Sequence, residues 1–124
     1  MSVTSPNENH EEISSLSSFE TEAILNERFY SAVRKGLAHF GGDGIVESLL
    51  YMLELEHSVD LKKVATNTSH FRSALKGMFG TGAYVVENKI RDEFARQEKV
   101  VGEGKSLDEL VDLLRKDIES KRKQ

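Results

Sequence analysis

Apolar residues recur along most of this chain at steps of three and four, the spacing of one face of an α-helix. The first such stripe lies within residues 20–39 and comprises Leu25, Phe29, Ala32, Val33 and Leu37. Phe40 and a glycine-rich run around Asp43 follow it. Glycine readily adopts the left-handed conformation that ends a helix. The pattern therefore predicts a first helix that ends near His39.

The next segment, residues 44–56, is the most apolar of the chain. Its apolar residues cover more than half of a helix circumference: Ile45, Val46, Leu49, Leu50, Met52, Leu53 and Leu55. A helix that is apolar around most of its surface is usually buried on more than one side. We therefore expect this helix to be the centre of the bundle or to be packed on two sides.

The middle of the chain predicts three further helices, at residues 61–66, 70–79 and 82–97. The last two meet at a corner formed by Phe79, Gly80, Gly82 and Ala83. Apolar faces precede and follow this corner, so we interpret it as a close contact between two helices. On this interpretation, Gly82→Val should lower the melting temperature before it affects any binding.

Residues 100–105 have the composition of a linker, and residues 106–124 predict a C-terminal amphipathic helix. Ser106 followed by Glu109 matches a capping box, in which each side chain satisfies a backbone N–H of the first turn. The apolar stripe comprises Leu107, Leu110, Val111, Leu114 and Ile118. A helix of this length needs a partner surface, so it either docks on its own core or pairs with another copy.

Residues 1–18 are rich in Ser, Asn and Glu and contain few apolar side chains. Such a segment buries too little surface to offset its ordering entropy, which predicts a disordered N-terminal tail. The expected fold is all-α, a compact bundle of five to six helices. The helical core domain should occupy residues 19–99.

Composition limits the partners and the cellular compartment expected for the protein. The chain carries 17 basic and 21 acidic residues and has a net charge of −4, which argues against a surface wholly adapted to nucleic acid. The sequence contains no cysteine, which fits a reducing compartment. No apolar run approaches the roughly 20 residues that span a bilayer, and no secretory signal is apparent. We expect a cytoplasmic protein without a membrane partner.

The sequence shows no arrangement of residues typical of catalysis. No two of the four histidines lie three or four residues apart, and the Glu54–His57 pair alone is too few ligands for a metal. No nucleophile elbow is present. Gly80 and Gly82 open a helix that could hold a phosphate, but no strand precedes them. We expect no enzymatic activity, no cofactor and no metal.

An alternative function is DNA binding through residues 61–79. A short helix, a break and a second helix resemble a helix-turn-helix, with basic residues at Lys62, Lys63, Arg72 and Lys76. Residues 67–69 could then contact phosphates. Against this alternative, Phe71, Leu75 and Met78 make the second helix look committed to the core.

A protein-interaction role rests on surplus apolar surface. Tyr51, Leu53, Leu55, Val100, Val101 and the C-terminal stripe exceed what a core of this size needs. Exposed apolar stripes tend to become interfaces. The partner is then an unidentified protein or a second copy, with the C-terminal helix as the main contributor. A third alternative is a small ligand held in a pocket beside the glycine corner.

Two segments carry a family resemblance: LLYMLELEHSVDL and HFRSALKGMFGTGAYVVENKIRDEF. Their pattern resembles the small all-helical output domains known from Nitrosopumilus-type ammonia-oxidising archaea, which have a Phe-Gly-x-Gly-Ala corner between helices. The resemblance covers about residues 22–94, and its motif is Phe79 to Ala83. It implies a regulatory or signal-transduction role and no catalytic residues. The leading function is therefore a non-enzymatic output module that acts through protein–protein interaction.

Overall fold

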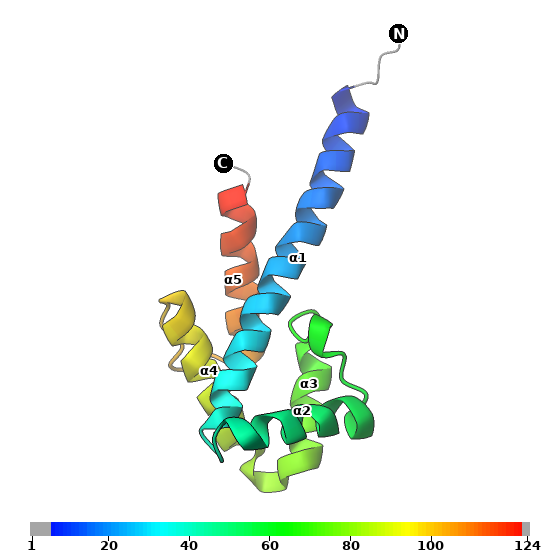
Figure 1. Cartoon of the computed structure of the whole chain (residues 1–124). Coiled ribbons are helices and arrows are strands. Elements are labelled where there is room, and N and C mark those ends of the chain that lie inside the picture. The colour runs from blue at the N-terminus through cyan, green and yellow to red at the C-terminus, as the bar shows by residue number, and fades with distance from the viewer. Residues whose placement is uncertain (1–5, 123–124) are drawn as a thin grey trace.

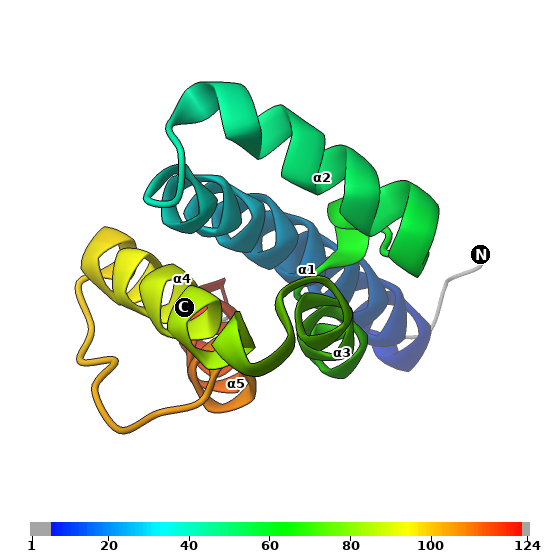
Figure 2. The same ribbon diagram turned by 90° about the horizontal axis from the view of Figure 1, so that it is seen from below.

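The longest helix of the protein runs through the middle of the fold (Figure 1). The computed structural model describes the backbone of residues 6–122 and the side chains of residues 18–121. Helix α1, Pro6–Ala38, has 33 residues and therefore extends about 50 Å at 1.5 Å per residue. Helices α2, α4 and α5 pack around it (Figures 1 and 2). Helix α1 is thus the axis of the bundle.

Six shorter elements follow α1. They are α2 (Asp43–His57), the 3-10 turn η1 (Leu61–Lys63), α3 (Thr68–Phe79), the 3-10 turn η2 (Gly80–Gly82), α4 (Ala83–Glu98) and α5 (Leu107–Arg122). Residues 6–122 contain no strand. The all-α class predicted from the sequence is confirmed.

The core forms where the predicted stripe of α1 meets the other helices. Phe29 lies at its centre, with its ring edge-on to Phe71 of α3 at 5.9 Å between ring centroids and to Phe94 of α4 at 5.1 Å. Edge-to-face pairs of this kind add stability beyond the area that they bury. The predicted stripe residues are all fully buried: Leu25, Phe29, Ala32, Val33 and Leu37.

The N-terminal segment differs from the prediction of a disordered tail. Helix α1 begins at Pro6, so residues 6–18 are helical, whereas residues 1–5 lie outside the described part of the chain. Proline is favoured at the first helical position, where its missing N–H costs nothing. Elongating a helix that is already nucleated adds one hydrogen bond per residue. The composition of a short segment does not reveal this continuity.

The predicted helix at residues 61–66 is a single 3-10 turn. Asp60 caps the turn by accepting a hydrogen bond from Lys62 N at 3.0 Å. The chain then leaves the helical path because the amide oxygen of Asn26, on α1, accepts hydrogen bonds from Ala65 N at 2.7 Å and Thr66 N at 3.2 Å. A tertiary contact therefore ends the turn where propensity predicted a longer helix.

Helix α2 is peripheral and is not the central helix that its composition predicted. Figure 2 shows it lying across the outside of α1. Val46, Leu50 and Leu53 on one side are buried, whereas Tyr51 and Leu55 on the other side are exposed. The apolar residues of α2 therefore cover two faces, of which one lacks a partner within the described chain.

The glycine corner is a tight turn but not a close helix contact. Gly80 has a φ of 58°, which only glycine adopts without strain. Gly82 has an ordinary helical φ of −82°, and a Cβ added there would meet nothing within 4 Å. A close helix contact at Gly82, on which the prediction for Gly82→Val rested, is therefore not found, although Ala83 is buried and Phe79 packs against the core.

Gly36 allows a close contact between the backbones of two helices. An added Cβ on this residue of α1 would lie 2.8 Å from Ile90 Cα and 3.0 Å from Ile90 N. These are backbone atoms of α4, so α1 and α4 cross almost backbone to backbone. The absence of a side chain at Gly36 sets the distance between the two helices.

Candidate functional site

The apolar stripe of α5, predicted as an interaction surface, lies in the core of its own chain. Leu107, Leu110, Val111, Leu114 and Ile118 are all buried. The predicted capping box forms: Glu109 N donates to Ser106 Oγ, and Ser106 N donates to Glu109 Oε1, both at 3.1 Å. Because α1 and its neighbours cover this stripe, it is not available to a second copy. The predicted interface on α5 is thus corrected: α5 uses its apolar stripe to close its own bundle.

Arg115 fixes the polar side of α5 to α1. Its Nε donates to Glu22 at 2.5 Å, and its Nη2 donates to Ala65 O at 3.2 Å. The hydrogen bond to Glu22 raises the pKa of Arg115 against the opposing effect of burial. This ion pair joins the two helices and the loop after η1 in one network.

The four basic residues of the DNA-binding alternative do not form one exposed basic surface. Lys62, Lys63 and Lys76 are exposed. Arg72 instead donates to Asp108 of α5 at 2.9 Å and to Glu87 of α4 at 3.3 Å. Burial alone would lower the pKa of Arg72, but these hydrogen bonds outweigh it and raise the pKa. Arg72 therefore links α3 to α4 and α5. Its guanidinium group is engaged within the protein and does not project from a surface that could enter a DNA groove.

Two of the three polar residues expected to contact phosphates, Asn67 and Thr68, have internal partners as well. Asn67 caps α3 by accepting from His70 N at 3.3 Å. Thr68 Oγ1 donates a hydrogen bond to Asp108. Phe71 and Leu75 are buried, and Met78 is half-buried against the core, as the sequence suggested. This helix holds the fold together.

The apolar surface that remains open lies on α2. We define the α2 outer face as Ile45, Ser48, Tyr51, Met52 and Leu55, each of which lies three or four positions from another member of the set. Tyr51 and Leu55 are each 63% exposed, and Ile45 is 40% exposed. Other exposed large apolar residues lie on other segments: Phe19, Phe40, Tyr84, Val85, Val101 and Leu113. The α2 outer face is an apolar stripe along one helix, the kind of feature that marks an interaction surface.

Acidic side chains flank the α2 outer face. Helix α2 carries Asp43, Glu47, Glu54 and Glu56 and no lysine or arginine. Glu47 pairs with Arg34 of α1, and this hydrogen bond raises the pKa of Arg34. Asp43, Glu54 and Glu56 form no ion pair with any residue in the described part of the chain. The flanks therefore present unpaired negative charge.

A groove opens between α1 and the acidic side of α2. This α1–α2 groove has a volume of about 470 Å³ and is lined by Ala23, Asn26, Glu27, Tyr30, Glu54, Leu61 and Lys62. Glu27 and Glu54 contribute one carboxylate from each helix, and neither is paired within the described chain. Glu54 lies three residues from Tyr51, so the groove and the α2 outer face are neighbours on the helix surface.

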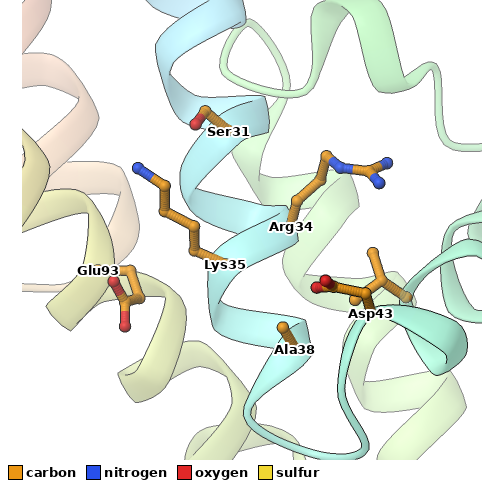
Figure 3. A pocket seen from close by; sticks show the side chains of 7 residues that line it. Ser31, Arg34, Lys35, Ala38, Asp43 and Glu93 are labelled. Atoms are coloured by element: carbon orange, nitrogen blue, oxygen red, sulfur yellow. The ribbon is translucent and has the colours of Figure 1, made fainter.

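A second hollow lies where α1 faces the start of α2 and the middle of α4 (Figure 3). Its volume is about 450 Å³, and Arg34, Lys35 and Glu93 line it. In Figure 3, Arg34 extends towards α2 and Lys35 towards α4. Each has a partner, because Arg34 pairs with Glu47 and Lys35 Nζ donates to Gln97 at 3.2 Å. Both basic side chains of this hollow are therefore engaged in contacts between helices.

Glu93, on α4, is an acidic residue whose pKa is displaced from its ordinary value. Its carboxylate lies 2.6 Å from His39 Nε2 and 2.9 Å from Arg96 Nη1. The hydrogen bond to His39 lowers the pKa of Glu93, and Arg96 adds to this effect against a smaller opposing effect of burial. Glu93 is held ionised and links α4 to His39, the residue that follows the end of α1.

Comparison with protein-family models, curated proteins and solved structures finds no match to this chain. The resemblance of residues 22–94 to archaeal output domains therefore stays a prediction. Among residues 6–122, no helix is long and apolar enough to cross a membrane. The same described residues contain no cluster of three His, Asp or Glu side chains placed to hold a metal ion.

Sequence reasoning identified part of this surface. Tyr51 and Leu55 were among the surplus apolar residues, and the breadth of the apolar pattern in residues 44–56 was the available signal. Glu27 and Glu54 were missed because they lie far apart in the sequence and meet only when η1 and α2 pack on α1. No spacing rule links them.

Proposed function

We propose that this protein is a non-enzymatic regulatory module that binds a protein partner through the α2 outer face. The observation that carries the proposal is the 63% exposure of both Tyr51 and Leu55 on a helix whose opposite side is in the core. Large aromatic and aliphatic side chains on one exposed stripe are typical anchors of an interface. The signal-output role rests on the family resemblance, and a cytoplasmic location fits the absence of cysteine.

The α2 outer face replaces α5 as the proposed interface. The apolar side chains of α5 already have partners within the chain, so their exposure to a partner would require the bundle to open. The α2 outer face needs no such opening. Binding through α2 therefore leaves the fold intact and costs no unfolding.

The test is a pair of double variants expressed with an affinity tag in the native cell. Tyr51→Ser/Leu55→Ser should lose the protein that co-purifies with wild type while keeping the wild-type melting temperature. Tyr84→Ser/Val85→Ser is the matched control, since Tyr84 is 66% exposed but lies on α4. Retention of the partner by the α2 variant, together with its loss by the α4 variant, would contradict the proposal.

A further inference from the structure

We infer that the segment bound by the α2 outer face is an amphipathic helix with lysine or arginine on its flank, and that one of these cations enters the α1–α2 groove between Glu27 and Glu54. This inference rests on the proposed function and names the chemistry of the partner. It follows from shape, from charge and from the position of the groove.

The shape of the surface suits a helix. Ser48, Tyr51 and Leu55 lie in register along α2, with Ile45 and Met52 beside them. Side chains at this spacing form a ridge, and the ridges of one helix pack into the grooves of another. Ser48, the small residue of this set, stands between Ile45 and Tyr51 along the helix.

The charges without an ionic partner on α2, and Glu27 beside it on α1, are all negative. Asp43, Glu54 and Glu56 on α2 and Glu27 on α1 form no ion pair within the described chain. Lys62, which also lines the groove, is the one basic residue among its lining residues. Complementary charge on a partner steers the encounter and excludes partners of the same sign.

The α1–α2 groove explains where a partner cation would be held. Its volume of about 470 Å³ accommodates a long side chain, and Tyr30 and Leu61 provide apolar wall. Lysine and arginine bury their methylene stems against such walls while the charged head reaches a polar group. Here the head reaches the two carboxylates, Glu27 and Glu54. The groove lies beside Tyr51, so one helix can contact both features.

A second copy of this chain is a poor occupant of the same surface. In a two-fold symmetric dimer the same patch meets itself, so α2 would lie against α2. The unpaired Asp43, Glu54 and Glu56 of one copy would then face those of the other. Like charges placed together across an interface are destabilising.

The inference is tested by displaying a library of helical peptides that share a fixed leucine stripe and carry Lys, Glu, Gln or Ser at each flanking position. Selection on the full-length protein follows removal of every peptide that binds Tyr51→Ser/Leu55→Ser. We expect lysine to be enriched over glutamate at flanking positions on one side of the stripe. Enrichment of neutral or acidic flanks, or no enriched peptide at all, would overturn the inference.

The groove is tested with a selected peptide in fluorescence anisotropy. Glu27→Gln/Glu54→Gln should weaken binding by about three- to tenfold, the range expected for one or two partly exposed ion pairs, and should reduce its salt dependence. Glu103→Gln is the control, because Glu103 lies in the exposed α4–α5 loop on the far side of α1 from α2 (Figure 2). Equal affinity of the double variant and wild type would contradict a role for the groove.

The outcomes separate the inference from the function on which it rests. If Tyr51→Ser/Leu55→Ser loses the native partner while the library shows no preference for lysine, the surface is correct and the partner chemistry is wrong. If wild type forms a dimer in sedimentation equilibrium that this variant abolishes, a second copy is the occupant and the inference fails. If the variant retains the native partner, the proposed function fails first.

Discussion

At the scale of single residues, buried polar groups and glycines determine the fold as much as the apolar stripes. Asn26 is buried, and its amide uses both of its donors and accepts twice: Nδ2 donates to Glu22 O and Thr66 Oγ1, and Oδ1 accepts from Ala65 N and Thr66 N. A fully satisfied side-chain amide of this kind positions the loop after η1 against α1. The sequence gives no sign of this role, because Ala65 and Thr66 lie about 40 residues from Asn26.

Gly36 provides a prediction on packing. Gly36→Ala would gain about 1 kcal/mol of helix propensity but would press a methyl group against the backbone of Ile90, at a cost of about 1–3 kcal/mol. We expect a lower melting temperature, by about 4–8 °C for each net kcal/mol in a domain of this size. Gly82→Ala is the control and should leave the melting temperature unchanged or raise it. A larger fall in melting temperature for Gly82→Ala than for Gly36→Ala would contradict this prediction. It would show that the close contact between helices lies at the glycine corner.

Glu93 provides a prediction on pH. The hydrogen bond to His39 lowers the pKa of Glu93 below the ordinary value of 4.5. A carboxyl group whose pKa is lower in the folded than in the unfolded state stabilises the fold above the unfolded pKa and loses this effect as the pH falls through the folded pKa. Glu93→Gln should therefore lower the melting temperature at neutral pH and flatten its decline below about pH 4.5.

The control for this prediction is Glu103→Gln, which removes an exposed carboxylate of the α4–α5 loop. Thermal melts of both variants across the acid range measure the effect. If the acid-side slope of Glu93→Gln is the same as that of wild type, the His39–Glu93–Arg96 contact does not contribute to stability.

At the scale of the elements, periodicity predicted helices better than it predicted their ends. The predicted helices at residues 44–56, 70–79 and 82–97 correspond to α2, α3 and α4. The predicted start of the first helix was wrong, since α1 begins at Pro6. The predicted length of the helix at residues 61–66 was also wrong, since contacts with Asn26 end η1 after one turn. Local patterns report which residues share a face, whereas the ends depend on contacts with distant residues.

Helix α5 provides a prediction at this scale. Leu110 is fully buried, whereas Leu113 on the same helix is 43% exposed. Leu110→Ala should reduce the free energy of unfolding by about 2–5 kcal/mol, the cost of a cavity. Leu113→Ala should change it by less than about 0.5 kcal/mol. Urea unfolding measures both, and a Leu110→Ala protein of unchanged stability but reduced mass would show that α5 is an interface between copies.

At the scale of the whole molecule, the sequence could not decide which apolar stripe stays open. The stripes of α5 and of α2 are similar in the sequence, and both were candidates for an interface. In the fold, α5 packs along α1, while α2 crosses at the outside (Figures 1 and 2). Tyr51 and Leu55 of α2 are each 63% exposed. Which surface is free therefore depends on how the helices are arranged. This choice required a structure, as did the groove that Glu27 and Glu54 share.

The most direct test of this account is site-specific photocrosslinking in the native cell. A benzophenone amino acid replaces Tyr51 in one protein and Tyr84 in another, two tyrosines of similar exposure on different helices. The account predicts a discrete covalent adduct with a protein partner from position 51 and none from position 84. An adduct from position 84 with none from position 51 would contradict the assignment of the α2 outer face as the interaction surface.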